Sequence, residues 1–259
     1  MPHIHKITVY PIKSLDGTDV PQAKITENGS LYLDRAFVLK NVSGRTVNAK
    51  KYPFLQKVRA NYDLEAQEVK LKVNDQEAHF QLMEENVQIA RFFSDYLGEQ
   101  IRMETDFRAG FPDDDQNSGP TIVSTRTFEE LQGWFPGLSL DNLRQRFRAN
   151  IELGNCPEPF WEDRLFAHPG VNRRFQLGTV EVIGKQPCAR CPVPTRNPLS
   201  GVGNQDFMRE FIAKRRKTLP SFANEAQFDH FYRLCVNTII PPSEAGKEIK
   251  LEDFLSDSH

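Results

Sequence analysis

The chain has 259 residues, 39% of them hydrophobic and 26% charged, which is typical of a soluble globular protein with one large domain or two small ones. Lys and Arg total 33 against 35 for Asp and Glu, and this near-neutral balance argues against partners such as duplex nucleic acid or a membrane surface. Four cysteines are too few for a disulfide scaffold, and no run of about 18 apolar residues predicts a membrane span, so we expect free thiols and a cytoplasmic location.

The first hundred residues predict mainly strands. Ile7 and Val9 alternate with polar residues before a turn-like stretch at residues 10–17. Alternation of apolar and polar residues at 58–64 and 69–73 predicts a β-hairpin. A helix follows, which we expect to end at Gly98; its apolar stripe comprises Ile89, Phe92, Phe93, Tyr96 and Leu97.

Residues 111–120 are acidic and rich in turn formers, which favours a loop between two lobes joined near residues 98–120. Beyond it, strands are predicted at residues 121–124, 150–153 and 179–183, and helices around residues 127–134 and within 206–232. The basic run Lys214–Lys217 is interpreted as a solvated helix end. The overall expectation is a β-rich fold, an all-β or barrel-like architecture with peripheral helices.

Two thiols, an arginine and three prolines fall within residues 186–195. The prolines fix the backbone and remove donors, so we expect a stiff loop or strand edge here. Cys188 and Cys191 are compatible with structural zinc, a thioredoxin-like dithiol, a single thiolate that ligates a soft metal or cofactor, or two buried small hydrophobic side chains. Zinc would need more ligands, and Cys156 and Cys235 are isolated in the sequence. The loop alone leaves these alternatives open.

A second cationic segment has three arginines in five residues, at positions 144, 146 and 148. Phe147 and Ile151 indicate that this segment enters the core, where a buried arginine needs an anion or another acceptor. Lys13–Ser14 and Asp34–Arg35 add donors near predicted strand ends. A cofactor with a phosphate group and a thiolate-bound metal would satisfy both sets of residues.

Together these residues resemble the MOSC family, which is named for the C-terminal domain of molybdenum cofactor sulfurase. Within the family they look more like the members with an extra N-terminal β-barrel domain, such as the mitochondrial amidoxime-reducing component and its bacterial relatives. The similar segments are Tyr10–Ser14 with Gly17, Leu33–Phe37, Val47–Lys50, Ile122–Ser124 before Phe128–Leu131, Arg146–Ile151 before Phe160–Asp163, and Cys188–Cys191 before Thr195, Pro198 and Gly201.

The resemblance implies an N-terminal MOSC β-barrel domain over residues 1–100 and a MOSC domain over residues 101–259. It implies a molybdenum-pyranopterin cofactor, with Cys191 as the catalytic residue and the thiolate ligand of the metal; pyridoxal phosphate is not expected. Cys188 would pack beside the site without ligating. The cofactor-binding residues would be Lys13, Ser14, Arg35, Ser124, Arg148, Asn150, Arg190 and Thr195.

The implied activity is oxidoreduction, in which small N-hydroxylated or N-oxygenated compounds are reduced (N-reductive detoxification). Many bacterial relatives carry an iron–sulfur domain with four further cysteines, which this sequence lacks. Electrons would then come from a separate donor protein, a ferredoxin or a flavoprotein. Asp163 or Glu162 would be available for proton relay. The alternative is a non-catalytic cofactor carrier or a sulfur-transfer module that forms a cysteine persulfide. Ala149 replaces the family's usual proline, and Arg196 replaces the second threonine of a threonine pair.

Overall fold

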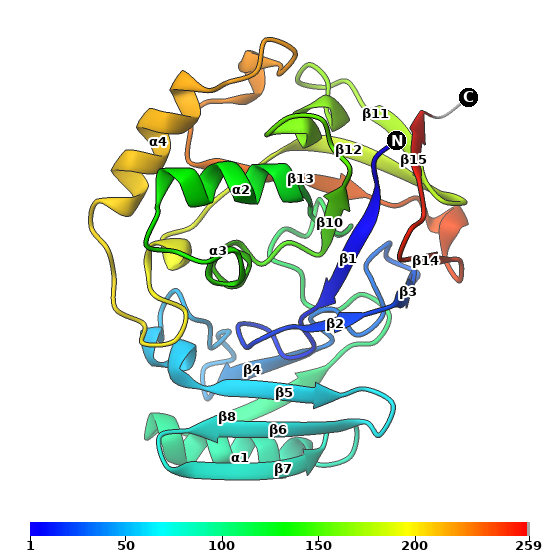
Figure 1. Ribbon diagram of the computed structural model, residues 1–259. Helices are drawn as coiled ribbons and strands as arrows, with labels where there is room; N and C mark the ends of the chain where they lie inside the picture. Colours follow the sequence, from blue (N-terminus) through cyan, green and yellow to red (C-terminus); the bar gives the residue numbers. More distant parts are fainter. Residues whose placement is uncertain (258–259) are drawn as a thin grey trace.

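The computed structural model describes residues 1–257 (Figure 1). Its largest element is an eight-stranded sheet in which all neighbours are antiparallel except β9 and β10. In spatial order the strands are β15 (Leu255–Asp257), β11 (Arg173–Leu177), β12 (Val180–Ala189), β13 (Arg233–Ile239), β9 (Ile122–Ser124), β10 (Ile151–Gly154), β1 (His3–Val9) and β2 (Thr18–Val20).

Smaller sheets and one helix make up most of the N-terminal part, in the lower half of Figure 1. They are the pair β4 (Phe37–Asn41) and β8 (Ile101–Thr105), the three strands β5 (Arg59–Asp63), β6 (Glu68–Val73) and β7 (Gln76–Gln81), the 3-10 helix η1 (Pro53–Lys57) and the helix α1 (Asn86–Leu97). The strand β3 (Gln22–Lys24) pairs with β14 (Glu248–Lys250). Gly98 ends α1 with a left-handed φ of 69°, as the sequence predicts.

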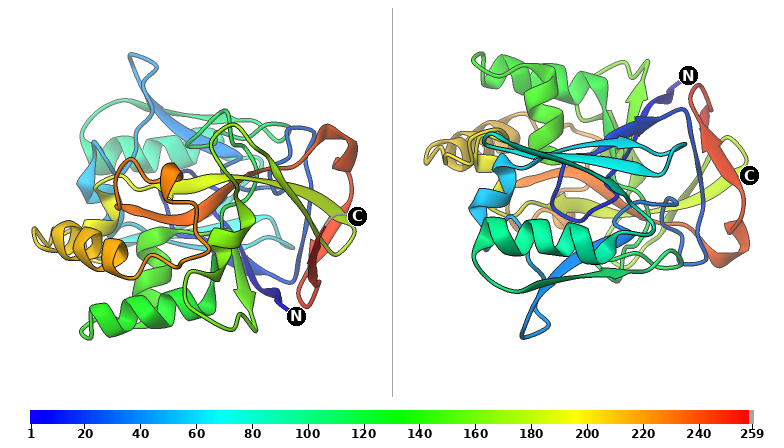
Figure 2. Two further views of the ribbon diagram at one scale, coloured as in Figure 1. Left: turned by 90° about the horizontal axis from the view of Figure 1, so that it is seen from above. Right: turned by 90° about the horizontal axis from the view of Figure 1, so that it is seen from below.

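Three helices pack beside the large sheet around an aromatic core of their own. They are α2 (Thr125–Trp134), α3 (Leu140–Phe147) and α4 (Phe207–Lys217), and short 3-10 helices occur at η2 (Trp161–Leu165), η3 (Val193–Thr195), η4 (Glu225–Gln227) and η5 (Pro242–Glu244). Phe207 and Phe211 of α4 contact Phe135, Phe147 and Trp134, with ring centroids 4.4–5.7 Å apart. The views along the vertical axis show α4 at the periphery (Figure 2).

The two largest hydrophobic cores do not divide the chain at one point in the sequence. Ile4, Ile7 and Val9 of β1 are buried in the core of the large sheet, whose other members come mostly from residues 122–255. A second core is built from residues 12–101 and includes Leu39, Leu71 and Phe93. The first strand of the N-terminal region therefore belongs, by its packing, to the C-terminal sheet. The domain boundary at residue 100 stays a prediction.

The β-rich class is confirmed, although the strand pairings within residues 1–257 give open sheets and not closed barrels. The predicted hairpin is β5–β6, with Asp63 opposite Glu68, and the sequence reading missed its third strand β7 and the helix α3. The helix predicted within residues 206–232 ends at Lys217. The interpretation of the basic run as a solvated helix end was wrong for Arg215, whose side chain is 1% exposed and ion-paired with Asp163.

Candidate functional site

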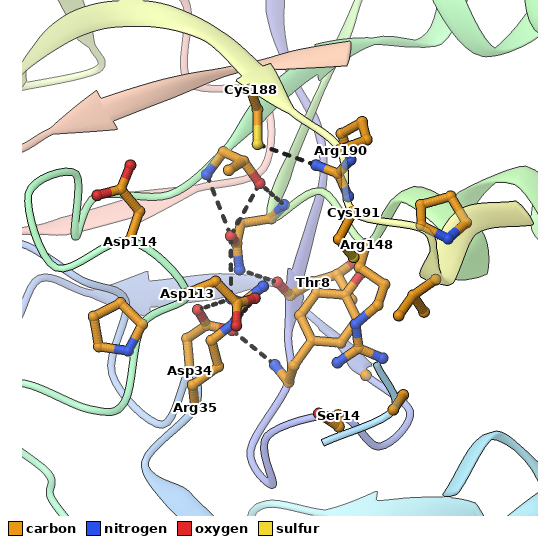
Figure 3. A pocket seen from close by; sticks show the side chains of 18 of the residues that line it. Thr8, Ser14, Asp34, Arg35, Asp113, Asp114, Arg148, Cys188, Arg190 and Cys191 are labelled. Carbon is orange, nitrogen blue, oxygen red and sulfur yellow. Dashed lines mark hydrogen bonds and ion pairs between the residues drawn. The ribbon is translucent and has the colours of Figure 1, made fainter. Parts of the chain in front are cut away.

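A cavity of about 1130 Å³ lies where the N-terminal part meets the large sheet (Figure 3). Its lining includes five of the eight predicted cofactor-binding residues and both cysteines of the Cys-x-x-Cys pair: Ser14, Arg35, Arg148, Asn150, Arg190, Cys188 and Cys191. These residues are scattered over nearly 180 positions of the sequence. The fold therefore brings together most of the residues that the sequence analysis singled out.

The three clustered arginines have three different environments. Arg144 forms a bidentate ion pair with the buried carboxylate of Glu152, with N–O distances of 2.8 and 2.9 Å. Arg146 is buried and donates two hydrogen bonds of 2.7 Å to the carbonyls of Pro194 and Arg196, in the loop that follows Cys191. All three line the cavity, but Arg148, the C-cap of α3 with a left-handed φ of 50°, has no carboxylate partner among residues 1–257 and donates only to the Leu15 carbonyl. Arg148 is thus the member of the cluster that is placed to bind a ligand.

The cysteine loop is held from both sides by the arginine segment. Cys188 lies near the end of β12, and Cys191 is exposed in the loop before η3. The guanidinium of Arg190 donates one hydrogen bond to the Phe147 carbonyl and another, 3.3 Å long, to the Cys188 sulfur. Figure 3 shows Cys188 and Arg190 together on one side of the cavity. Proline stiffness and these hydrogen bonds fix the position of the Cys191 backbone.

Lys13 is already committed to protein partners. Its ammonium donates to the carbonyls of Phe111 and Pro112, at 2.8 and 2.7 Å, and forms an ion pair of 3.0 Å with Asp113. An ammonium has three hydrogens, so these contacts use its donor capacity. Lys13 is not part of the cavity lining; it anchors the acidic loop that the sequence predicts at residues 111–120.

Arg35 faces two carboxylates across the cavity. It is ion-paired with Asp34, and its Nε lies 3.8 Å from Asp113. Desolvation would raise the pKa of Asp113, but the charges of Arg35 and Lys13 outweigh it and hold the pKa at about 2. Asp113 therefore stays ionised near neutral pH and neutralises this side of the cavity. Figure 3 shows Asp34, Arg35 and Asp113 as one group.

Three arginines of the cavity lining have no carboxylate partner among residues 1–257: Arg146, Arg148 and Arg190. Backbone carbonyls already hold Arg146, which leaves Arg148 and Arg190 as candidates to bind a ligand. Arg148 donates to the Leu15 carbonyl and stacks 4.1 Å from the Tyr10 ring centroid, and burial lowers its pKa. Neither Arg148 nor Arg190 forms an ion pair with any residue in the range 1–257, and the Nε of Arg190 is buried without a hydrogen-bond partner. Partly buried cations without an anion are costly, so this side of the cavity favours an anionic ligand.

Three predicted site residues have left-handed backbone, which is rare outside glycine. The φ angles are 75° at Ser14, 53° at Arg35 and 50° at Arg148. Each such residue costs roughly 1–2 kcal/mol, a strain that proteins retain mainly where it positions functional groups. Three of the ten non-glycine residues with positive φ in the range 1–257 therefore line the cavity, and the left-handed backbone sets the direction of their side chains.

The structure does not bring Ser124 and Thr195 to the cavity lining. Ser124 is fully buried and caps α2 by accepting a hydrogen bond from the backbone N–H of Thr127. The hydroxyl of Thr195 donates to the Pro192 carbonyl at 2.7 Å and closes the turn after Cys191. Both contacts are those of structural residues.

Asn150 lines the cavity, but its side-chain amide is used within the protein. The amide donates to the Thr8 carbonyl at 3.1 Å and accepts from the backbone N–H of Thr121 at 3.2 Å. A longer contact of 3.5 Å joins the Asn150 oxygen to Arg35. Asn150 therefore links β1 to the start of β9 and orients Arg35.

The acids considered for proton relay are buried away from the cavity lining. Glu162 accepts hydrogen bonds from the Thr127 hydroxyl at 2.9 Å and from the Ser124 N–H at 3.3 Å. Asp163 is ion-paired with Arg215. A direct proton relay by either residue has no support in this geometry.

The four cysteines are unpaired, and they differ in environment. Burial raises the pKa of Cys156 to about 12 and raises that of Cys235 as well, so both stay protonated near neutral pH. Cys188 and Cys191 line the cavity. Within residues 1–257, His, Cys, Asp and Glu side chains form no group of three or more suited to a metal ion.

The sequence analysis missed several cavity residues, including Tyr10, Asp34, Arg59, Asp113 and Arg233. Tyr10 and Asp34 lie within segments that the sequence analysis singled out, but it gave their own side chains no site role. Arg59 and Arg233 belong to strands whose patterns gave no reason to separate them from other surface arginines.

Comparison with known proteins finds a family match for the N-terminal part of the chain. Residues 1–100 match the family model described as the MOSC N-terminal beta barrel domain. The match covers 100 of the 259 residues, and the likeness is that of this part of the chain. Proteins of the MOSC family are associated with the molybdenum cofactor, which agrees with a cavity that combines a thiol with uncompensated arginines. No curated protein matches the chain.

The matched residues include Ser14 and Arg35 of the cavity lining, whereas both cysteines and the arginine segment lie beyond the match. No helix among residues 1–257 has the length and apolar character required to cross a bilayer.

Proposed function

We propose that the protein is a molybdenum-cofactor-dependent oxidoreductase that reduces N-hydroxylated or N-oxygenated small molecules. The observation that carries the proposal is the placement of the exposed Cys191 thiol in one cavity with Arg148 and Arg190, two arginines without an ion-pair partner in the described chain.

The residues present fit a pyranopterin cofactor with a terminal phosphate. Thiolates are preferred ligands for soft metals, and Cys191 would supply one. Arg148 and Arg190 would neutralise the phosphate, because planar guanidinium groups bind phosphate oxygens in pairs. The Nε of Arg190, which has no partner in residues 1–257, matches this need. Lys13 would contribute indirectly, by holding the loop that carries Asp113.

When bound, the metal would supply two-electron oxygen-atom chemistry at the substrate nitrogen. Reduction of an N–OH group then takes two electrons and two protons and releases the amine and one water. Arg35, paired with Asp34 and Asp113, keeps the opposite wall of the cavity nearly neutral. A neutral wall suits an uncharged N-hydroxylated substrate. We also propose a cytoplasmic location, supported by the four unpaired thiols.

The direct test is a reductase assay on a simple amidoxime with a chemical electron donor such as reduced methyl viologen. Protein made in a host that synthesises the cofactor should convert the amidoxime to the amidine, and Cys191→Ala should lose the activity. Equal activity in the wild-type protein and Cys191→Ala would refute the proposal. The alternative is a sulfur-transfer module that carries a persulfide on Cys188, whose sulfur accepts a hydrogen bond from Arg190. Such a module would release no amidine, and Cys188→Ala would abolish its sulfur transfer.

A further inference from the structure

Positive charge is concentrated in two segments of a chain whose total charge is near zero. Residues 35–62 contain seven Lys or Arg and no Asp or Glu, and residues 182–205 contain three Lys or Arg and no Asp or Glu. The protein as a whole has 33 basic and 35 acidic residues. Such separation creates a local positive field that the net charge conceals.

The two segments touch each other beside the cavity. Arg196 donates to the Ala49 carbonyl at 2.6 Å, and Arg59 donates to the Pro198 carbonyl at 3.0 Å. Gly201 packs against η1, since a Cβ built there lies 3.1 Å from the Pro53 carbonyl oxygen. Figure 1 shows the loop after β12 descending toward η1. Lys50 and Pro198 line the cavity, so the joined segments form part of its rim.

Apolar side chains are exposed on the same rim. Phe54 is 62% exposed, Leu199 is 57% exposed and Val202 is 68% exposed. Lys57 stands over the Phe54 ring, with its Nζ 5.5 Å from the centroid, and Lys51 is exposed nearby in sequence. We call this surface the basic rim; it comprises Lys50, Lys51, Lys57, Phe54, Leu199 and Val202. Acids that reach its margins include Asp16, paired with Arg59, and Glu99, beside Tyr52.

We propose that the basic rim docks a small acidic electron-transfer protein. The proposal rests on the proposed function, which needs electrons delivered to the cavity. Transient redox complexes use small interfaces in which complementary charge steers the encounter and a few apolar contacts fix the geometry. The basic rim has both kinds of residue, and it borders the cavity that contains Cys191.

A small protein fits this surface better than a long polyanion or a flat anionic membrane. The cavity lining also contains Asp19, Asp141 and the run Asp113–Asp115. An extended anionic partner centred on the cavity would meet these acids as well as the lysines. A compact partner covers the basic side alone and avoids the repulsion.

The test measures binding of two probes, an acidic [2Fe–2S] ferredoxin and a flavodoxin, at about 20 mM and about 500 mM salt, where screening differs strongly. We expect at least one to bind at low salt and to dissociate at high salt. The double variant Lys51→Glu/Lys57→Glu should weaken that binding at least tenfold. The matched control Lys24→Glu/Lys250→Glu, on the β3–β14 pair, should change it less than twofold. Phe54→Ser should weaken binding without altering its salt dependence.

The activity with a chemical donor separates this proposal from the proposed function. Neither Lys51 nor Lys57 lines the cavity, so the double variant should keep wild-type turnover with reduced methyl viologen. If the wild-type protein lacks this turnover, the proposed function fails. The salt-dependent binding of the two probes still tests whether the basic rim docks an acidic protein. The docking proposal is overturned if neither probe binds, if the rim and control variants bind equally, or if RNA or phosphatidylserine vesicles bind in preference to both probes.

Discussion

The arginines at positions 144, 146 and 148 show how residues of one type, close in sequence, acquire different roles. Each residue of a helix is rotated by about 100° from the one before, so Arg144 and Arg146, two positions apart, leave α3 on nearly opposite sides. The left-handed φ of 50° at Arg148 then redirects the chain at the helix end. Arg144 forms a structural ion pair, Arg146 donates hydrogen bonds to carbonyls of the cysteine loop, and Arg148 donates only to the Leu15 carbonyl within residues 1–257.

Arg148→Ala should lower the affinity for the phosphate-bearing cofactor by roughly tenfold or more, the value of one charge-assisted contact. The stability of the cofactor-free protein should not fall, because the substitution removes a buried cation without an ion-pair partner in the described chain. The measurements are cofactor content and denaturant unfolding.

Arg144→Ala is the matched control in the same segment. It leaves the Glu152 carboxylate buried without its partner, which should cost about 3–5 kcal/mol of unfolding free energy. If Arg148→Ala lowers the free energy of unfolding as much as Arg144→Ala does and leaves the cofactor content unchanged, then Arg148 is a structural residue and does not bind the cofactor.

Glu162 predicts a dependence of stability on pH. Burial, aided by the neighbouring Asp163, raises the pKa of Glu162 from about 4.5 to about 7. The folded state then holds a proton between these values that the unfolded state has lost. The stabilising contribution is full below about pH 4.5 and disappears as the pH rises through 7, a change of up to about 3 kcal/mol.

Glu162→Gln should flatten this dependence, since glutamine can keep an acceptor for Ser124 and Thr127 and does not ionise. The measurement is urea unfolding at pH 5, 7 and 8. A variant whose stability still declines between pH 5 and 8 as steeply as that of the wild type would show that Glu162 is not the source.

At the scale of elements, a buried ion pair joins α4 to η2 and contributes to the stability of the fold. Arg215 joins the helix to Asp163 in η2 and stacks 4.0 Å from the centroid of the Phe160 ring. Arg215→Ala should therefore lower the free energy of unfolding by about 3–5 kcal/mol, because it leaves a buried carboxylate unpaired. The exposed Lys217→Ala, two positions later, should cost less than about 0.5 kcal/mol. Similar values for both variants in denaturant unfolding would contradict the structure.

Elements with strong local patterns were predictable from the sequence. The β5–β6 hairpin and α1 have clear periods of two and 3.6, and α1 ends at a glycine as expected. The helix α3 was missed because its eight residues are mostly polar and charged, with only Leu143 and Phe147 as buried apolar side chains. The buried state of Arg215 depends on Asp163, 52 residues away, and local pattern carries no such information.

At the scale of the whole molecule, the N-terminal strand is shared between two parts. β1 lies between β10 and β2 in the large sheet, and Ile4 and Ile7 are fully buried in that sheet's core. A fragment of residues 101–259 would lose this strand and expose the edge of β10. We expect it to be unfolded or aggregated by circular dichroism and size exclusion, whereas a fragment that folds cooperatively alone would establish the boundary at residue 100.

The candidate site was predictable from the sequence where reactive or charged side chains occur together in a short motif. Cys188, Arg190, Cys191, Arg148, Arg35 and Ser14 were all singled out, and all line the cavity. Lys13, Ser124 and Thr195 have the side chains expected of ligands, but the structure uses them to anchor a loop, a helix and a turn. Sequence shows that a donor is present, whereas only the fold shows whether it is already occupied.

The central claim is that Cys191 holds a metal in this cavity, and the metal content of the purified protein tests it most directly. Protein from a host that makes the cofactor should contain close to one molybdenum per chain by mass spectrometry of the metal. Cys191→Ala should lose most of it, and Cys188→Ala should keep most of it. A folded wild-type protein without molybdenum, or equal loss in the two variants, would contradict the claim.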